Sequence, residues 1–418
     1  MLYSEALAFI HSRPRFTPER AGERMALLLA RLGDPQKQLS FVHVTGTNGK
    51  GSFSAMTASM LSAAGKKTGL FISPYILEFR ERIQCGGGMI PKETLARLTA
   101  RLIPEIEALD AAGTPVNEFM TVTALGLLWF LEERCDIVVL EVGIGGFHDA
   151  TNCIPPPVLS VIMGIGLDHQ NILGERITDI ARDKSGIIKG NPTLLYPDQP
   201  EEAVSVIMER CAKTGAPLTI PSVSTLAILS EDFDRTVFRY GDHPYTLPLI
   251  GRYQLKNAVT AITAGRMLGL PEEAIAKGIA SVRFPARMEL VSHDPDILID
   301  GAHNVHGMTA LTDSIRALLP GRKVIALVGM MRDKDFADAL ALLAPLVSRV
   351  FTVTIDYPRT ASAAETAAVL SPMTPAEAYD DWLSGLRAAI AAAKSDGSLL
   401  LVCGSLYLAA DVRRELLD

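Results

Sequence analysis

A short apolar strand, a glycine-rich loop and a helix follow one another near residue 45, and this run constrains the fold more than any other feature. The strand is Phe41–Thr45 (FVHVT), the loop is GTNGKGS at 46–52, and a helical pattern continues to Ala64, where Gly65 ends it. Glycines let backbone N–H groups turn inward around phosphate oxygens, and a helix N-terminus adds a favourable dipole. The segment therefore predicts a phosphate-binding site in an α/β protein.

Two side chains of this loop have the chemistry that a bound nucleotide needs. Lys50 can reach terminal phosphates as a point charge, and the Ser52 hydroxyl can ligate magnesium. The strict pattern GxxxxGK[ST] is not met, because the first glycine is closer and Gly51 separates the lysine from the serine. The alternative is a glycine-rich turn that carries a solvent-exposed lysine.

The rest of the chain alternates β-branched runs with longer helical patterns, which indicates an α/β fold with mostly parallel strands. Two domains are predicted: residues 1–287, a P-loop-type ATPase domain with a mostly parallel sheet, and residues 288–418, a Rossmann-like α/β domain. We expect a small antiparallel hairpin within 225–249, at the edge of the first domain, and a linker over 284–296. The main elements expected are strands at 68–72, 137–142, 158–164, 297–300, 323–329, 349–354 and 398–404, and helices at 91–108, 121–133, 256–268 and 272–281.

Composition and charge exclude several classes of protein. The five cysteines are far apart and form no CxxC pair, so neither a zinc knuckle nor a disulfide framework is predicted. A net charge of −7 disfavours non-specific nucleic-acid binding. No window of about 18 residues is apolar and free of charge, and the N-terminus lacks the pattern of a secretory signal. We expect a cytoplasmic monomer whose partners are small molecules, with no nucleic-acid or membrane partner.

Three further residues suit a metal–phosphate site. Glu141 ends an apolar strand before a Gly-Ile-Gly-Gly turn, where ligands of open α/β sheets bind and where a carboxylate can hold magnesium. His169 follows another strand end, and Lys184 precedes Gly186 beside an apolar pair. The alternatives are a structural carboxylate, a structural histidine and a surface lysine.

Nine motifs, in this order along the chain, resemble those of folylpolyglutamate synthases and dihydrofolate synthases in the Mur ligase superfamily. They are TGTNGKGS, SPYILEFRERI, EVGIGGFHDATN, LDHQNILG, IARDKSGIIK, FPARMEL, DGAHNVHG, ALVGMMRDKD and VCGSLYL. The resemblance implies a Mur ligase central-type ATP-binding domain followed by a glutamate ligase domain. It also implies an ATP-dependent carboxylate–amine ligase. Such an enzyme phosphorylates a pterin carboxylate with ATP, and the amino group of L-glutamate then attacks the acyl phosphate.

The resemblance also implies roles for individual residues. Catalytic roles fall to Lys50, His169 and Lys184, of which Lys184 matches a family lysine that is carbamylated. ATP would be bound by Thr47, Asn48, Gly49, Lys50, Gly51, Ser52, Asn257, Arg287 and Asp300. Mg²⁺ would be held by Ser52, Ser73, Glu141, His169 and Lys184, with a monovalent cation such as K⁺ as a further candidate cofactor. Substrate contacts would come from Gly22, Arg24, Glu118, Phe119, His148, Asp149, Ala150 and His303, with Asn304 beside His303.

The chain departs from the family pattern at Tyr75, at Phe147-His148, at Ala286 and at Val305. Those at Tyr75 and Phe147-His148 lie on the expected folate side and leave the ATP motifs intact, so the sequence leaves open whether the acceptor is dihydropteroate, a reduced folate, or both. Three other functions are less compatible with the sequence. A peptidoglycan-precursor ligase would need an N-terminal domain before the loop, and a non-catalytic nucleotide-binding protein would not need Lys50, Ser52, Glu141, His169 and Lys184 together. A dinucleotide oxidoreductase would need a GxGxxG, which the segment 299–304 lacks.

Overall fold

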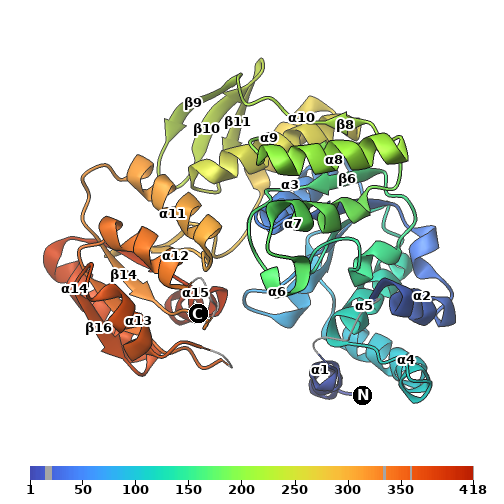
Figure 1. Cartoon of the computed structure of the whole chain (residues 1–418), viewed down its shortest axis with the longest axis horizontal. Helices are drawn as coiled ribbons and strands as arrows, with labels where there is room; N and C mark the ends of the chain where they lie inside the picture. Colours follow the sequence, from blue (N-terminus) through green and yellow to red (C-terminus); the bar gives the residue numbers. More distant parts are fainter. Residues whose placement is uncertain (15–20, 333–335, 358–359, 418) are drawn as a thin grey trace. The chain divides into compact units, whose positions relative to one another are not determined.

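The chain forms two compact units. The computed structural model describes residues 1–14, 21–332, 336–357 and 360–417. The first unit contains residues 1–225 and 256–281, and the second contains 226–255 and 282–418, within the described ranges (Figure 1). The chain therefore passes between the units after residues 225, 255 and 281, rather than once after residue 287.

The first unit is built on one large, mostly parallel sheet. Its eight strands lie in the order β4-β3-β2-β5-β1-β6-β7-β8, and only β3 and β4 run antiparallel. The strands are β1 (Phe41–Thr45), β2 (Thr68–Phe71), β3 (Ile83–Cys85), β4 (Gly88–Met89), β5 (Ile137–Glu141), β6 (Leu159–Ile162), β7 (Thr193–Leu195) and β8 (Leu218–Thr219). The central strand β1 is buried along its whole length, as its apolar, β-branched sequence predicts for a strand covered on both faces.

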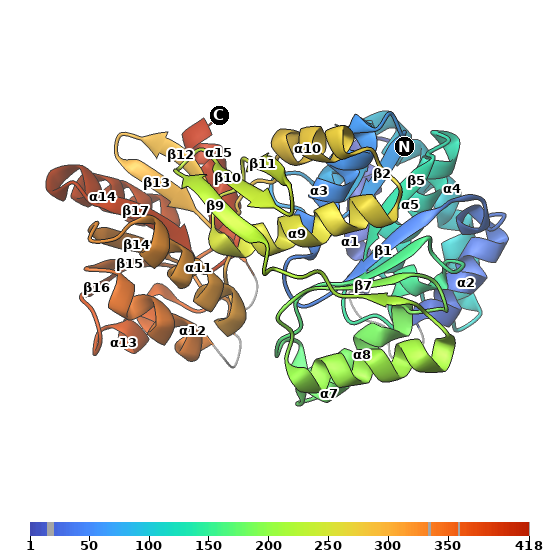
Figure 2. The same ribbon diagram turned by 90° about the horizontal axis from the view of Figure 1, so that it is seen from above.

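Helices cover this sheet. They are α1 (Tyr3–Ser12), α2 (Ala21–Arg31), α3 (Lys50–Ala63), α4 (Lys92–Ala111), α5 (Glu118–Glu132), α6 (Gln170–Leu173), α7 (Ile177–Lys184), α8 (Glu201–Thr214), α9 (Arg252–Met267) and α10 (Glu272–Ser281). Short 3₁₀ turns lie at η1 (Pro35–Gln38), η2 (Phe79–Arg82), η3 (Ala150–Cys153) and η4 (Ser185–Ile187). The helix after the glycine loop, α3, is buried over most of its length, and α10 packs directly beside it (Figure 2).

The predicted hairpin exists, but its placement in the first domain was wrong. It turns at Gly241-Asp242 within a three-stranded antiparallel sheet of β9 (Leu226–Glu231), β10 (Thr236–Tyr240) and β11 (His243–Leu247). Phe233, Ile250 and Tyr253, which lie between and after these strands, pack in the core of the second unit. This burial of apolar side chains explains why the segment belongs with the C-terminal half.

The second unit has a six-stranded sheet in the order β12-β13-β17-β14-β15-β16, with only β12 antiparallel. Its strands are β12 (Glu289–His293), β13 (Asp296–Ile299), β14 (Val324–Val328), β15 (Val350–Val353), β16 (Ala376–Tyr379) and β17 (Leu399–Cys403). Its helices are α11 (Val305–Leu318), α12 (Phe336–Leu343), α13 (Ala363–Leu370), α14 (Trp382–Asp396) and α15 (Leu406–Leu417), with the turn η5 (Ala344–Leu346). The predicted α/β architecture is confirmed, but the segment expected to be a linker contains the edge strand β12. No helix among the described residues is long and apolar enough to cross a bilayer.

The contact between α10 and α3 predicts the effect of a single added methyl group. A Cβ placed on Gly278 would lie 2.4 Å from the Cα of Met60 and 2.6 Å from its backbone nitrogen. Ala is the better helix former by roughly 1 kcal/mol, so Gly278→Ala would stabilise an uncrowded helix. We expect the opposite, a loss of about 1–3 kcal/mol, because backbone cannot move aside cheaply. Thermal unfolding of Gly278→Ala is compared with Gly88→Ala, whose added Cβ meets its nearest atom at 3.8 Å. The Tm of Gly278→Ala should fall while that of Gly88→Ala stays close to wild type. An unchanged or raised Tm for Gly278→Ala would contradict the packing argument.

Candidate functional site

The glycine loop after β1 is shaped by contacts that only glycine permits. Gly46 and Gly49 both have positive φ, at 151° and 85°. A Cβ on Gly46 would lie 2.7 Å from the Cβ of Met163, and one on Gly49 would lie 2.7 Å from Oδ1 of Asn257. The predicted nucleotide residue Asn257, on α9, therefore covers the loop at the start of α3, as a nucleotide-binding role would require.

The chain after β6 holds the loop from the other side. The backbone N–H of Thr47 donates to the Gly164 carbonyl at 2.8 Å, and its hydroxyl donates to the Gly166 carbonyl at 3.0 Å. These bonds fix the path of the loop backbone ahead of α3, whose N-terminus is the part of such a motif that binds phosphate.

Two lysine side chains converge on one carbonyl of this loop. The Nζ of Lys50 donates to the Gly46 carbonyl at 2.9 Å and to the Thr47 carbonyl at 3.2 Å. The Nζ of Lys184, whose residue is 3% exposed, donates to the same Gly46 carbonyl at 3.1 Å. Burial, together with repulsion from Lys50, lowers the pKa of Lys184 to about 7, against the attraction of nearby carboxylates. Sequence composition alone suggested a surface lysine at 184, and that alternative is excluded.

A second glycine turn, 143–146, positions Lys184. A Cβ on Gly145 would overlap the Asp183 carboxylate, and one on Gly146 would lie 2.9 Å from the Lys184 carbonyl oxygen. The N–H of Phe147 donates to the Asp183 carbonyl at 2.9 Å. The C-terminal end of α7 thus packs against the backbone of residues 145–147. The side chain of its last residue, Lys184, reaches the glycine loop at the Gly46 carbonyl. The sequence shows this run of glycines but does not predict that the run positions Lys184.

The strand ends meet at one edge of the sheet, as predicted. In the parallel register Val44 lies opposite Glu141, Thr45 opposite Ile162, and Phe71 opposite Leu140. Glu141 is 3% exposed and accepts a hydrogen bond from the backbone N–H of Ser73 at 3.1 Å. The predicted metal residues Ser73 and Glu141 are therefore in contact beside the loop.

The donors at this edge suit a hard cation. Ser52 supplies a hydroxyl and Glu141 a carboxylate, the oxygen ligands that magnesium prefers. Among the described residues no group of three His, Cys, Asp or Glu could hold a metal ion. A magnesium ion bound here would accordingly take part of its coordination from water or phosphate oxygens, which is its usual behaviour beside nucleotides.

His169 follows β6, in the left-handed region at φ 49°, and is exposed. Its N–H donates to the Asp168 carboxylate at 2.8 Å, and the charge of Asp168 acts on Lys184. The structure thus brings this segment near the two lysines, and the metal or catalytic role of His169 stays a proposal.

The residues predicted to contact the acceptor come from three segments. The Phe119 ring lies against Gly143, where a Cβ would meet it at 2.7 Å, and the Glu118 carboxylate contacts His11 at 3.2 Å. The helix α2, which carries Gly22 and Arg24, packs on η3, whose first residue is the buried Ala150. The Nη1 of Arg24 is buried and has no hydrogen-bond partner among the described residues.

Asp149 stabilises its own loop through hydrogen bonds. Its carboxylate accepts hydrogen bonds from the N–H of Ile144 at 3.1 Å, from the N–H of Thr151 at 2.8 Å and from the Thr151 hydroxyl at 2.6 Å. It therefore holds the glycine turn together, and its neighbours Phe147 and His148 are the exposed groups of this loop.

In the second unit, Asp300 and Arg287 form a buried polar centre. Asp300 is 4% exposed, and its carboxylate accepts from the Tyr253 hydroxyl at 3.0 Å, from Met288 N–H at 2.9 Å and from Ala302 N–H at 2.7 Å. Burial raises the pKa of Asp300, while the Arg287 guanidinium opposes the rise. Sequence reasoning missed Tyr253, because no local signal joins it to residue 300.

His303 and Asn304 follow directly. Nδ1 of His303 lies 2.9 Å from the Gly301 carbonyl oxygen, and the Asn304 side chain caps α11 by accepting from Gly307 N–H at 2.7 Å.

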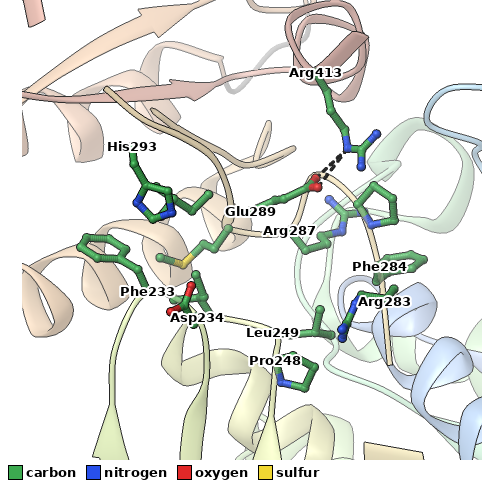
Figure 3. Close-up of a pocket in the computed structure, with 14 residues that line it drawn as sticks. Phe233, Asp234, Pro248, Leu249, Arg283, Phe284, Arg287, Glu289, His293 and Arg413 are labelled. Carbon is green, nitrogen blue, oxygen red and sulfur yellow. Dashed lines mark hydrogen bonds and ion pairs between the residues drawn. The ribbon is translucent and has the colours of Figure 1, made fainter. Parts of the chain in front are cut away.

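The same unit contains a pocket of about 400 Å³ (Figure 3). Arg283, Phe284 and Arg287 line one side of it, and the Glu289–Arg413 ion pair, at 2.9 and 3.0 Å, lines another. The Arg287 guanidinium lies 5.8 Å from the Phe284 ring centre. Asp300 and His303 are not among the described residues that line it, but Arg287 and Met288 are, so the pocket adjoins the polar centre around Asp300.

Known proteins of similar sequence and structure match this chain over nearly its whole length. A family profile described as Mur ligase, glutamate ligase domain, matches residues 286–406. The dihydrofolate synthase/folylpolyglutamate synthase of Bacillus subtilis is 34% identical over 99% of this chain and 99% of its own length. The structure of Escherichia coli FolC with DHPP and ADP matches with a TM-score of 0.87 at 32% identity, over 99% of this chain and 97% of that one. An FPGS–AMPPCP–folate complex matches with a TM-score of 0.86 at 34% identity, over 100% of both chains.

A buried histidine under the site makes a prediction about pH. Nε2 of His43, on β1, lies 2.8 Å from the Thr151 hydroxyl, which in turn donates to Asp149. Neutral His43 is thus the donor, and its Nδ1 is buried without a partner in the described part of the chain. Burial lowers the pKa of His43 from 6.5 to about 3, with repulsion from Lys189 as a smaller cause. Below pH 6.5 the unfolded chain binds a proton that the folded chain does not, so stability falls as the pH falls from 6.5 toward 3.

We expect His43→Gln to lose stability less steeply over that range, because glutamine can still donate to Thr151 but does not titrate. The measurement is the free energy of urea unfolding at a series of pH values. His243→Gln, at an exposed position, is the control and should follow the wild-type slope. Parallel slopes for wild type and His43→Gln would show that His43 is protonated in the folded chain.

Proposed function

The chain belongs to the dihydrofolate synthase/folylpolyglutamate synthase family, and on that premise we propose that it works through an acyl phosphate made from ATP. It is an ATP-dependent ligase that joins glutamate to folates. The observation that carries the proposal is the pair of lysines on the Gly46 carbonyl, next to the Ser73–Glu141 contact at the same sheet edge. An anionic carboxylate must approach an anionic phosphate here, and the positive charge of Lys50, together with magnesium, would lower the cost of that approach.

The loop and α3 hold the triphosphate. The N–H groups at the start of α3 and the positive end of its dipole are proposed to face the phosphates, and Lys50 supplies a point charge already fixed by two carbonyls. Asn257 covers the loop from α9 and limits where the nucleotide can lie.

Ser52 and Glu141 would hold magnesium, which would neutralise charge on the phosphate oxygens. Ser73 and His169 are proposed as further neighbours of that ion.

Lys184 is proposed to act as a carbamate. With a pKa of about 7 much of its amine is neutral near neutral pH, and a neutral amine can add carbon dioxide to become an anion. An anionic group at this position would suit a magnesium ion, whereas an ammonium would repel it. The alternative is an unmodified lysine that contacts phosphate directly.

The acceptor is proposed to lie over the three segments that meet beside β5. Arg24 presents a buried guanidinium nitrogen, Phe119 an aromatic ring, and His148 an exposed ring. Glu118, Gly22, Asp149 and Ala150 shape this surface. One related complex contains folate, and the Bacillus subtilis relative is named as both a dihydrofolate synthase and a folylpolyglutamate synthase, which makes both dihydropteroate and folate reasonable acceptors to test. In the second unit, Arg287 and Asp300 are proposed as nucleotide contacts and His303 as a contact of the incoming glutamate.

Turnover of ATP is expected to need magnesium and a pterin acceptor. Without the acceptor no carboxylate can attack the γ-phosphate, so ADP release should fall at least about tenfold.

Lys50→Ala should lower kcat by roughly 100-fold or more, as removal of one charge-stabilising donor commonly does. The assay measures ADP release with ATP, glutamate and either dihydropteroate or tetrahydrofolate. Lys66→Ala, an exposed lysine just beyond α3, is the control and should keep full activity. Rapid ATP hydrolysis without acceptor would contradict the ligase mechanism.

Lys184→Ala should be inactive, and small molecules can then tell the carbamate from the ammonium. If Lys184 acts as a carbamate, acetate or propionate should restore part of the activity, whereas if it acts as an ammonium, ethylamine should do so. Arg182→Ala, an exposed position on the same helix, is the control. Full activity of Lys184→Ala without additive would contradict both forms of the proposal.

A further inference from the structure

Two cysteines far apart in the sequence lie side by side in the first unit. The sulfur atoms of Cys85, at the end of β3, and Cys135, between α5 and β5, are 3.3 Å apart. Cys85 is partly exposed and Cys135 is buried. A disulfide has an S–S distance of about 2.05 Å, so a small rotation of the two side chains would bring them into bonding range.

The backbone on both sides of the pair is fixed to the start of β2. The N–H of Gly86 donates to the Thr68 carbonyl at 3.0 Å, and the N–H of Asp136 donates to the Lys67 carbonyl at 2.8 Å. The Asp136 carboxylate accepts in return from Lys67 N–H at 2.8 Å. The residue of β2 opposite Cys85 is Gly69, which has no side chain. The approach of the thiols is therefore built into the sheet and does not depend on mobile loops.

The surroundings of the pair favour reaction at Cys85. A hydrogen bond from Cys135 lowers the pKa of Cys85, and the charge of Lys67 adds to this effect against the desolvation by burial. The same interaction, with burial, raises the pKa of Cys135. Cys85 is thus the more accessible thiol of the pair and the one beside the Lys67 charge, which are the properties of a thiol that reacts first with an external disulfide. Cys153 is also partly exposed, but burial raises its pKa to about 12.

We propose that Cys85 and Cys135 are a reversible thiol–disulfide site, oxidised by small disulfides such as oxidised glutathione. The Cys85 thiolate attacks one sulfur of the external disulfide and releases one thiolate, which leaves a mixed disulfide on Cys85. The Cys135 sulfur then attacks Cys85, releases the second thiol and closes the internal bond. Two protein thiols are oxidised, the external disulfide is reduced to two thiols, and the two protons pass to the leaving thiolates.

The internal bond would join the antiparallel edge β3–β4 to the start of β5. It would close a chain segment of some 50 residues, from Cys85 to Cys135, and a bond that closes a long segment restricts the unfolded chain. Both cysteines lie toward the ends of β2 and β5 that are opposite to Ser73 and Glu141. The bond should therefore stabilise the unit without rearranging the phosphate site.

The test uses the full chain, reduced and then incubated with oxidised glutathione. Remaining thiols are alkylated, and peptide mapping by mass spectrometry assigns the bonds. We expect one linked pair, Cys85–Cys135, that dithiothreitol reverses, with a Tm at least about 2 °C above that of the reduced chain.

Cys135→Ser should instead retain glutathione on Cys85 and show no rise in Tm, because the resolving thiol is gone. Cys153→Ser is the matched control and should form the Cys85–Cys135 bond as the wild type does. A stable glutathione adduct on wild-type Cys85, no reaction at Cys85, or a bond between other cysteines would each overturn the proposal. The wild-type map decides the question even where a variant fails to fold.

Discussion

The carbonyl oxygen of Gly46 receives the side chains of Lys50 and Lys184, and much of the first unit is arranged to hold these two amines together. Like charges at this separation repel, and burial adds to the cost for Lys184. Such an arrangement is stable only where backbone and packing fix it. The glycines at 46, 145 and 146 let three pieces of backbone approach to distances that a Cβ would prevent. A site whose groups are fixed in place before its anionic ligand binds is preorganised for phosphate chemistry.

The segment 143–151 links the surroundings of the glycine loop to the residues proposed to contact the acceptor. The segment 143–151 touches Lys184 through its glycines and β1 through the His43–Thr151–Asp149 chain. It also contacts Phe119 through Gly143. One loop therefore connects the strand before the glycine loop, the lysine at the end of α7 and the helix expected to meet the acceptor. The departures Phe147 and His148 lie on the exposed side of this loop, where they can alter acceptor preference without disturbing the buried contacts.

The second unit is organised in a comparable way around Asp300. Its carboxylate joins the end of β13, the backbone at Met288 and the Tyr253 hydroxyl, so that strand, linker and hairpin segment share one buried anion. Breaking such a centre by removing one partner is costly, because the remaining charge stays buried. The Tyr253–Asp300 bond thus adds to the burial of Phe233, Ile250 and Tyr253 in keeping residues 226–255 with the C-terminal half, although they precede the helix α10 of the first unit in the sequence.

The sequence by itself determined the features that depend on near neighbours. The strand–loop–helix at 41–63, the buried strands at 137–141 and 159–162, and the ends of those strands as the place for Glu141 and His169 all follow from local patterns of apolar residues and glycine. The family motifs added Lys184, Asn257 and Asp300, which no local pattern singles out. The edge strands β12 and β16 were missed because edge strands are only partly buried and need no continuous apolar run.

Only the tertiary structure decided which distant residues meet. It placed Lys184 on the Gly46 carbonyl, Tyr253 on Asp300, and Cys135 beside Cys85, each across many residues of chain. It also showed that the hairpin belongs to the second unit, and that the Asp149 carboxylate stabilises the glycine turn through the Ile144 N–H. Local sequence fixes the shape of each element through short-range sterics and hydrogen bonds. The neighbours of a buried polar group, and hence its charge state, follow from packing among elements that the sequence does not order in space.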